Sequence, residues 1–215
     1  MRIIRNSADL SKYSIVFYIN LFNYRGIRNY LGNENIGFTF DGISFTLIFR
    51  ILYLKRCERL SPDYTGYLNH YLADNRIHVY GSGKIDLERF VRNNSRLNII
   101  SSTNGFEPVT VFMNILKKNA IKGDIVLVGR GSPLQEQTIM ELVKSFPDLK
   151  YVAVGAFITQ FSNGSKYYPL FIDKLNLRWL YRLLNEQLYS RIPMYLKGLL
   201  SFVSDILLGR IKYRN

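Results

Sequence analysis

Hydrophobic residues come in short blocks along the chain, separated by polar and glycine-containing stretches. Apolar runs without internal alternation predict strands that are buried on both faces, as in a parallel sheet. These runs, with the turns that end them, are SIVFYIN (14–20), NIGFTF (35–40), RIHVYGSG (76–83), RLNIISSTNG (96–105), GDIVLVGRG (123–131) and LKYVAVGA (149–156). Blocks with apolar residues at helical spacing predict helices over 43–56, 63–72, 85–93, 109–120 and 134–146.

Strand and helix alternate over 76–156, which is typical of α/β proteins that carry helices on both faces of a mostly parallel sheet. The sequence therefore predicts a Rossmann-like domain over residues 1–165. The tail differs, because 175–192 and 193–211 predict two helices that are apolar on one side and basic on the other. We expect residues 166–215 to form a basic helical C-terminal appendage close to a membrane.

The net charge of +13 comes from 29 Lys and Arg against 16 Asp and Glu, and most of the excess lies near the two ends of the chain. Residues 1–60 hold 9 basic and 4 acidic residues, residues 166–215 hold 9 and 3, and the middle is nearly balanced. Such an excess indicates an anionic partner, which is a nucleic acid, a nucleotide phosphate or an acidic membrane surface. The alternative is a solubility feature or a general basic bias without a partner.

The sequence gives few indications of the cellular compartment in which the protein works. Cys57 is the single cysteine, which excludes an internal disulfide bond and fits a reducing cytoplasm. No run reaches the ~18 uninterrupted apolar residues of a membrane-spanning helix. The first apolar run is separated from the basic start by Asp9 and Lys12 and lacks a small-residue cleavage site, so no signal peptide is expected.

A glycine-rich corner, VGRGSP (128–133), ends one of the predicted strands. Ligands of parallel sheets bind beyond the carboxyl ends of the strands, and glycine lets backbone approach a ligand closely. The N–H groups at the start of the following helix suit a phosphate, and a Gln amide in its first turn can both donate to and accept from a nucleobase or a sugar. The candidate binding residues of this corner are Gly129, Gly131, Ser132, Gln135 and Glu136.

The alternative for this corner is an ordinary strand-to-helix turn, with Ser132 as the N-cap and Pro133 at the first helical position. The spacing GxGxP differs from GxGxxG, and no acidic residue ends the next predicted strand, so a nicotinamide dehydrogenase is disfavoured. The sequence also lacks a GxxxxGK[ST] phosphate loop. The GSG at 81–83 predicts a further turn.

Several stretches, in this order along the chain, resemble the WecG/TagA/CpsF glycosyltransferases. They are FDGISFTLIFRILYLKRCER (40–59), with Asp41 and Arg59 18 positions apart, STNGF (102–106), VGRGSPLQEQ (128–137) and PLFIDKLNLRWLYRLLNE (169–186). They resemble, in turn, the family's Asp-Gly to Glu-Arg segment, its Gly-Tyr-Phe turn, its VGxGxPxQE signature and its Pro to Trp-Leu-Tyr-Arg segment. The similarity covers residues from about 36 to 192, and the order of the pieces makes it specific.

The resemblance implies an inverting enzyme that moves a sugar from a UDP-sugar to an undecaprenyl-diphosphate-linked sugar in bacterial surface polysaccharide synthesis. The implied location is cytoplasmic, peripheral at the inner face of the plasma membrane. Such a transfer needs a base for the acceptor hydroxyl while the nucleotide diphosphate leaves. Asp41, a carboxylate at a predicted strand end beside Gly42, is the expected base. Its alternative role is a turn residue or the N-cap of the helix over 43–56.

The expected donor site combines the corner with Asn20 and Arg59. Asn20, in YINLF, is the candidate remnant of the family's Thr-Pro-Asn-Ala-Glu motif, and Arg59 would stabilise the leaving diphosphate. An ion pair with a helix end is the alternative role for Arg59. The sequence lacks an Asp-x-Asp pair, and neither His70 nor His78 belongs to an evident constellation of carboxylates, so we expect no metal and no cofactor.

Basic residues of the tail are expected to bind the acceptor diphosphate and an anionic membrane surface, near which each exposed Lys or Arg contributes on the order of 1 kcal/mol. Lys166 stands close to the place of a family arginine, Arg182 falls in the matching segment, and Arg191 adds to the charge. Trp179 is expected to pack the tail onto the sheet. The sequence leaves the oligomeric state open.

The chain departs from the family pattern at Tyr167, in place of an arginine, and at Ile158, in place of an acidic residue. These departures leave open a noncatalytic relative that acts as a scaffold in polysaccharide assembly. The third hypothesis is a basic nucleic-acid-binding α/β module. Because the charge segregates to the chain ends and no contiguous aromatic and basic motif is present, we expect no nucleic-acid partner.

Overall fold

The structure of the chain is a computed structural model. It describes residues 2–4, 7–41, 43–53, 60, 71–162, 169, 171–172, 177, 180–181, 184, 189 and 192–211. The predicted helices over 63–72 and 175–192 fall mostly outside the described residues.

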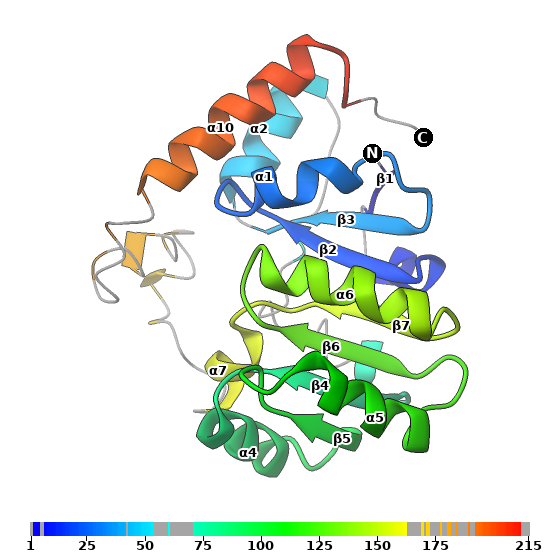
Figure 1. The fold of residues 1–215 in the computed structure, drawn as a ribbon. Helices are drawn as coiled ribbons and strands as arrows, with labels where there is room; N and C mark the ends of the chain where they lie inside the picture. The colour runs from blue at the N-terminus through cyan, green and yellow to red at the C-terminus, as the bar shows by residue number, and fades with distance from the viewer. Residues whose placement is uncertain are drawn as a thin grey trace.

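The described strands form one seven-stranded sheet in the order β1-β3-β2-β7-β6-β4-β5, and every neighbouring pair is parallel (Figure 1). The strands are β1 (Arg2–Ile3), β2 (Ile15–Ile19), β3 (Ile36–Phe40), β4 (Arg76–Gly81), β5 (Asn98–Thr103), β6 (Ile125–Gly129) and β7 (Lys150–Ala153). All residues of β2, β3 and β6 are buried, which explains why these runs are apolar without alternation. The predicted Rossmann-like α/β fold is confirmed, and β1 is the strand that the apolar pattern missed.

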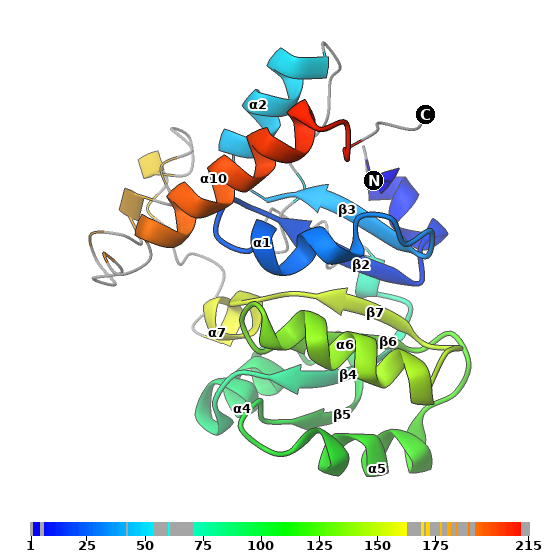
Figure 2. The ribbon, with the colours of Figure 1, turned by 45° about the horizontal axis from the view of Figure 1, so that its top comes forward.

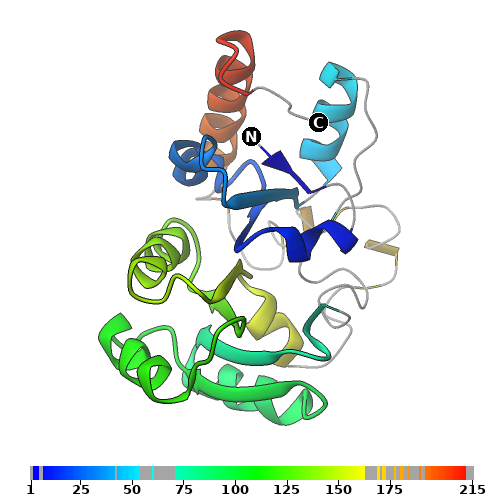
Figure 3. The same cartoon turned by 90° about the vertical axis from the view of Figure 1, so that its right-hand side faces the viewer.

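Helices cover both faces of the sheet (Figures 2 and 3). One hydrophobic cluster includes side chains of α1 (Tyr24–Ile27), α2 (Ile43–Tyr53), α5 (Val109–Asn119), α6 (Leu134–Ser145) and α10 (Ile192–Leu207). The cluster on the opposite face includes side chains of η1 (Ser7–Lys12), α4 (Lys84–Asn93) and α7 (Phe157–Ser162). The helical pattern predicted α2, α4, α5, α6 and α10, but it missed η1, α1, η2 (Arg28–Tyr30) and α7, which are all six residues or shorter.

The helix α10 packs closely on the α1 side of the sheet, although it is far from α1 in sequence. A Cβ atom on Gly198 would lie 1.7 Å from the carbonyl oxygen of Leu21, so only glycine fits at this position. Phe202 is fully buried, and its ring centroid lies 4.3 Å from that of Phe45 on α2. The division of the chain into 1–165 and 166–215 stays a prediction, but α10 contributes directly to the main core.

The outward face of α10 is apolar. Predicted as basic on one side, the helix instead exposes a run of aliphatic side chains opposite its buried Gly198 and Phe202. Its exposed large hydrophobic residues are Ile192, Met194, Leu196, Leu200, Val203 and Leu207. Within the described part of the chain, no helix has both the length and the apolar character to span a bilayer.

A buried polar cluster ties the amino ends of β4 and β6 together. Asp124 is 3% exposed and lies 3.0 Å from Nε2 of His78 and 3.1 Å from Nε of Arg76. The other ring nitrogen of His78 lies 2.8 Å from the Ser101 hydroxyl. This Ser-His-Asp chain has the residue types of a hydrolase triad, but the histidine is fully buried, so the chain is structural.

The close approach of α10 to Leu21 can be tested by substitution. We expect Gly198→Ala to lower the free energy of unfolding by about 1–3 kcal/mol, because the added methyl group overlaps backbone atoms that cannot rotate away. Gly32→Ala is the matched control, since no described atom lies within 4 Å of a Cβ there, and it should change stability by about 0.5 kcal/mol or less. Equal unfolding midpoints for the two variants in urea would contradict this packing.

Candidate active site

The ends of β2 and β3 bring an amide and a carboxylate together at the carboxyl edge of the sheet. Asp41 follows β3 directly, and its backbone N–H donates to the carbonyl oxygen of Ile19, the last residue of β2, at 2.8 Å. Asn20 is the next residue along the chain, and its Nδ2 lies 3.3 Å from Oδ2 of Asp41. Asp41 is partly exposed, so its carboxylate is both oriented by the protein and within reach of a substrate. Two of the predicted site residues are thus in contact.

The orientation of the Asn20 amide is set by Asn23. The backbone N–H of Asn23 donates to Oδ1 of Asn20 at 3.0 Å, and the backbone N–H of Asn20 donates to Oδ1 of Asn23 at 2.9 Å. Asn23 is itself held by the bond from its Nδ2 to the carbonyl of Tyr18 at 2.7 Å. Because the Asn20 oxygen is used in this way, its NH2 group is the part that faces Asp41.

The glycine-rich corner lies between β6 and α6, next to the segment that carries Asn20. A Cβ on Gly26 of α1 would lie 3.2 Å from Oγ of Ser132 and 3.4 Å from Cβ of Pro133, so α1 abuts the corner. The Ser132–Pro133 peptide bond is cis. The helix begins at Leu134 with no side-chain capping bond, so the alternative with Ser132 as N-cap and Pro133 at the first helical position is wrong.

The glycines along this edge allow neighbouring strand ends to pack backbone on backbone. A Cβ on Gly81, at the end of β4, would lie 2.5 Å from the oxygen of Gly129, and one on Gly129 would lie 2.9 Å from the oxygen of Gly155. A Cβ on Gly105, after β5, would lie 3.0 Å from Cα of Gly81. Gly129 therefore has a structural reason to be glycine, and its expected role in donor binding stays a prediction.

Gly131 and Gly155 differ from the packed glycines. Both have positive φ, +75° and +55°, and no described atom lies within 4 Å of a Cβ at either position. Gly155 follows β7, which lies between β2 and β6. The backbone at the centre of the carboxyl edge is therefore open on the side where a ligand of a parallel sheet would lie.

Gln135 and Glu136 turn inward and are nearly fully buried, with 4% and 1% exposure. Oε1 of Gln135 accepts from the backbone N–H of Gly155 at 3.0 Å, and its Nε2 donates to Oε1 of Glu136 at 3.0 Å. Both ends of the amide are thus used within the protein, which gives Gln135 a role in positioning the end of β7. A direct bond from Gln135 to a nucleobase or sugar stays a prediction.

The carboxylate of Glu136 is the unusual group of this helix start. Its Oε2 has no hydrogen-bond partner among the described residues, although it is buried. Burial raises the pKa of Glu136 above its usual value, and hydrogen bonding to Gln135, to its own backbone N–H and to Ser132 offsets only part of this effect. A buried acceptor without a partner, at a helix N-terminus next to the open backbone of Gly155, is the site's clearest unfilled polar position.

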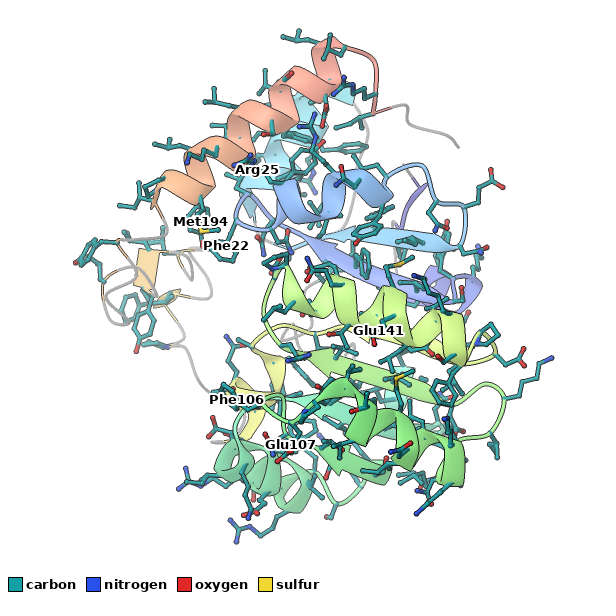
Figure 4. The ribbon with its side chains drawn as sticks, in the orientation of Figure 1. Phe22, Arg25, Phe106, Glu107, Glu141 and Met194 are labelled. Atoms are coloured by element: carbon teal, nitrogen blue, oxygen red, sulfur yellow. The ribbon has the colours of Figure 1, made fainter. Side chains whose placement is uncertain are left out.

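Three residues at this edge are not among the predicted site residues, although they lie in the stretches 81–83, 102–106 and 128–133 that the sequence singles out. Arg130 folds back so that its guanidinium lies 5.0 Å from the ring centre of Tyr80, and it donates to Oγ1 of Thr138 at 3.2 Å, which fixes the corner. Ser82 has a positive φ of 61° after β4. Phe106, labelled in Figure 4, is 85% exposed after β5. The available signal was position, since each follows a predicted strand.

Four predicted site residues, Arg59, Lys166, Arg182 and Arg191, lie outside the described residues, so their roles stay predictions. Among the residues that the structure describes, no three His, Cys, Asp or Glu side chains gather in a way that could hold a metal ion.

These features define a Rossmann-like α/β protein whose candidate active site lies at the carboxyl edge of the sheet. The family model described as Glycosyl transferase WecG/TagA/CpsF family matches residues 20–215. The chain belongs to this family, which confirms the resemblance in the sequence. It is also 26% identical, over 90% of its own length and 87% of the relative's, to the UDP-Gal:alpha-D-GlcNAc-diphosphoundecaprenol beta-1,4-galactosyltransferase of Shigella boydii.

The pH dependence of stability tests the buried state of Glu136. Its folded pKa is raised, so its contribution to stability is greatest below the unfolded pKa and is lost as pH rises through the folded pKa. We expect Glu136→Gln to flatten the fall in unfolding free energy as pH is raised from about 4 to 8. Glu141→Gln, an exposed position on the same helix (Figure 4), should leave the pH profile as in the wild type. Identical profiles for Glu136→Gln and wild type would contradict the burial.

Proposed function

We propose that the protein is an inverting glycosyltransferase that moves a sugar from a UDP-sugar to an undecaprenyl-diphosphate-linked sugar in bacterial surface polysaccharide synthesis. The observation that carries the proposal is the contact between Asn20 and Asp41 at the carboxyl edge, in a chain of this glycosyltransferase family. The Shigella boydii relative, by its name, uses a UDP-linked sugar and a diphosphoundecaprenol-linked acceptor.

Asp41 is the proposed base. Its carboxylate takes the proton of the acceptor hydroxyl as that oxygen attacks the sugar and UDP leaves. The N–H of Asn20 fixes the direction of the accepting oxygen. Partial exposure of Asp41 leaves room for the hydroxyl to reach it.

The distance across the sheet edge supports a nucleotide-sugar donor. Asp41 follows β3 and the corner follows β6, and β2 and β7 lie between them. With about 4.8 Å between neighbouring strands, the two ends of the site are roughly 14 Å apart, which is comparable to the length of a nucleoside diphosphate. A UDP moiety that lies over the open backbone of Gly155 and Gly131 would place its sugar beside Asp41.

The proposed transfer is metal-independent and uses no cofactor. The leaving diphosphate is stabilised by Arg59 and by the backbone of the corner at 129–132, together with the positive end of α6. Support comes from the sequence, which has no Asp-x-Asp pair. Lys166, Arg182 and Arg191 are proposed to bind the acceptor diphosphate.

The apolar outer face of α10 is the proposed contact with the lipid phase. Leu196, Leu200, Val203 and Leu207 follow one another at steps of four, three and four residues, so they form a single stripe along the helix. The exposed Leu47 and Ile51 of α2 add to the exposed apolar residues on this part of the fold, where α2 and α10 pack together. Contiguous exposed apolar surface marks a site of interaction with a protein or a membrane.

The position of α10 relative to the site favours a membrane. The helix begins close to the carboxyl edge, because the ring centres of Tyr195 and Phe22 lie 5.9 Å apart and Phe22 is two residues after Asn20. Figure 4 labels Phe22 close to Met194, at the start of α10. Lys197 and Arg210 on the same segment are exposed and suit anionic lipid headgroups. On this proposal, a lipid-linked acceptor enters the site from the surface on which α10 rests, and the protein lies peripherally at the inner face of the plasma membrane.

One observation favours the noncatalytic scaffold as a second candidate. Ile158, at the place of an acidic residue of the family, is fully buried in a hydrophobic cluster, and its Cδ1 lies 2.7 Å from the position of a Cβ on Gly129. The departure from the family pattern therefore lies directly beside the candidate site. A scaffold would bind its partners without releasing UDP.

The proposed base is tested by Asp41→Asn. We expect this variant to lose transfer by about a hundredfold or more, because it removes the proton acceptor while it keeps the side-chain shape. UDP binding should be kept, since the corner is unchanged. The assay screens UDP-sugars with a short-chain lipid-diphosphate sugar and measures UDP release.

Asp148→Asn, at an exposed position before β7 on the opposite edge of the sheet, is the control and should transfer as the wild type does. Wild-type activity in Asp41→Asn would remove Asp41 from the mechanism. A wild type that binds partners of polysaccharide assembly and releases no UDP with any donor would support the scaffold instead.

The proposed membrane contact is tested by Leu200→Glu, at a position that is 70% exposed. We expect binding to anionic phospholipid vesicles to fall about tenfold or more, because a charged group replaces an apolar one of roughly 2 kcal/mol transfer free energy. Ile121→Glu, exposed at the amino edge of the sheet, is the matched control and should bind as before. Equal cosedimentation of the two variants would show that α10 does not meet the membrane.

A further inference from the structure

Asp205 is a buried carboxylate on the inner face of α10, and several side chains converge on it. It is 1% exposed and accepts from Oη of Tyr24 at 2.9 Å and from Nε and Nη2 of Arg28 at 2.9 and 2.5 Å. Nη1 of Arg210 donates to Oδ1 of Asp205 at 3.3 Å. Burial alone would raise the pKa of Asp205, but the bonds from Arg28 and Tyr24 outweigh burial and hold the pKa below its usual value.

The residues that meet α10 belong to one short segment, which begins directly after Asn20. Three contacts join this segment to α10, in the same order along both. Gly198 packs on Leu21, the ring of Phe202 lies 5.2 Å from that of Tyr24, and Asp205 binds Arg28. The segment 21–28 is therefore held along its whole length by one face of α10.

The same segment sets the geometry of the candidate active site. The backbone N–H of Tyr24 donates to the carbonyl of Asn20 at 3.0 Å, and Asn23 forms the reciprocal pair of bonds that orients the Asn20 amide. The resulting bond to Asp41 is 3.3 Å long, at the far end of the hydrogen-bond range. A small displacement of the segment is enough to break it.

We propose that Asp205 is a positioning residue for the transfer reaction, which acts through Tyr24 and Arg28 to hold the segment 21–28 so that the Asn20 amide meets the Asp41 carboxylate. The inference rests on the proposed function, since it concerns the same base. It gives the C-terminal helix a role in the reaction besides the contact of its outer face with lipid. Asp205 touches no substrate, so its effect is indirect.

A second buried aspartate provides the control. Asp124 also binds an arginine, Arg76, in a nearly buried site, but it lies at the opposite edge of the sheet from Asp41. As for Asp205, bonds from neighbours lower its pKa despite burial. Asp124→Asn therefore breaks a comparable buried pair without touching the segment 21–28.

The test compares Asp205→Asn, Asn20→Ala, their double variant and Asp124→Asn in the UDP-release assay. We expect Asp205→Asn to lower kcat roughly ten- to hundredfold, with the donor KM unchanged. The double variant should be no slower than Asn20→Ala alone, because both changes remove the same contact. Asp124→Asn should lower the unfolding temperature but keep the wild-type kcat. Additive losses, or an unchanged kcat in Asp205→Asn, would overturn the inference.

A readout independent of turnover separates this inference from the proposed function. The 15N–1H resonances of the Asn20 side-chain amide should shift in Asp205→Asn and stay in place in Asp124→Asn. Unshifted resonances overturn the inference whatever the activity, whereas absence of transfer in the wild type together with shifted resonances overturns the proposed function and leaves Asp205 as the residue that orients the Asn20 amide. If Asp205→Asn does not fold, Arg28→Lys replaces it, because lysine keeps the charge and loses the two-pronged bond.

Discussion

The site depends on the last backbone hydrogen bond between β2 and β3, which the N–H of Asp41 donates to the carbonyl oxygen of Ile19. This bond places the first residue after one strand beside the first residue after its neighbour, so that Asn20 meets Asp41. Side chains alternate between the faces of a strand, and a register shift of one residue would turn Ile36, Phe38 and Phe40 of β3 away from the hydrophobic cluster to which they belong. Burial of every β3 residue therefore protects the geometry of a carboxylate that is itself partly exposed.

The other half of the edge is built on backbone contacts in place of side-chain bonds. Gly81 and Gly129, at the ends of β4 and β6, let their backbone approach the backbone of Gly129 and of Gly155 after β7 within distances that any side chain would prevent. Gln135 then fastens the end of β7 to the start of α6. The two halves meet where Gly26 of α1 packs against Ser132 of the corner. One half of the edge is thus held by side-chain hydrogen bonds and the other by close backbone packing.

The sequence predicts the architecture well, because the parallel strands are buried on both faces and their apolar runs are long enough to recognise. Short elements such as α1 and α7 were missed, since four to six residues carry too little periodicity. Glycines and a carboxylate at strand ends could be named, but their contacts could not, because strand order decides them. His78 and Asp124 are 46 positions apart and meet only because β4 and β6 are neighbours. Likewise, no local pattern shows that Gln135 binds the backbone of Gly155.

A helix that is apolar on two faces needs two apolar neighbours. For α10 one neighbour is the core around Phe202 and Phe45, and the position of the buried Asp205 within that face specifies how the helix docks, because a displaced carboxylate would lose Tyr24 and Arg28. Nothing in the described part of the chain covers the other face. Because the exposed apolar stripe and the residues that hold the segment 21–28 lie on one helix, whatever covers that stripe acts on the same rigid element that fixes Asn20.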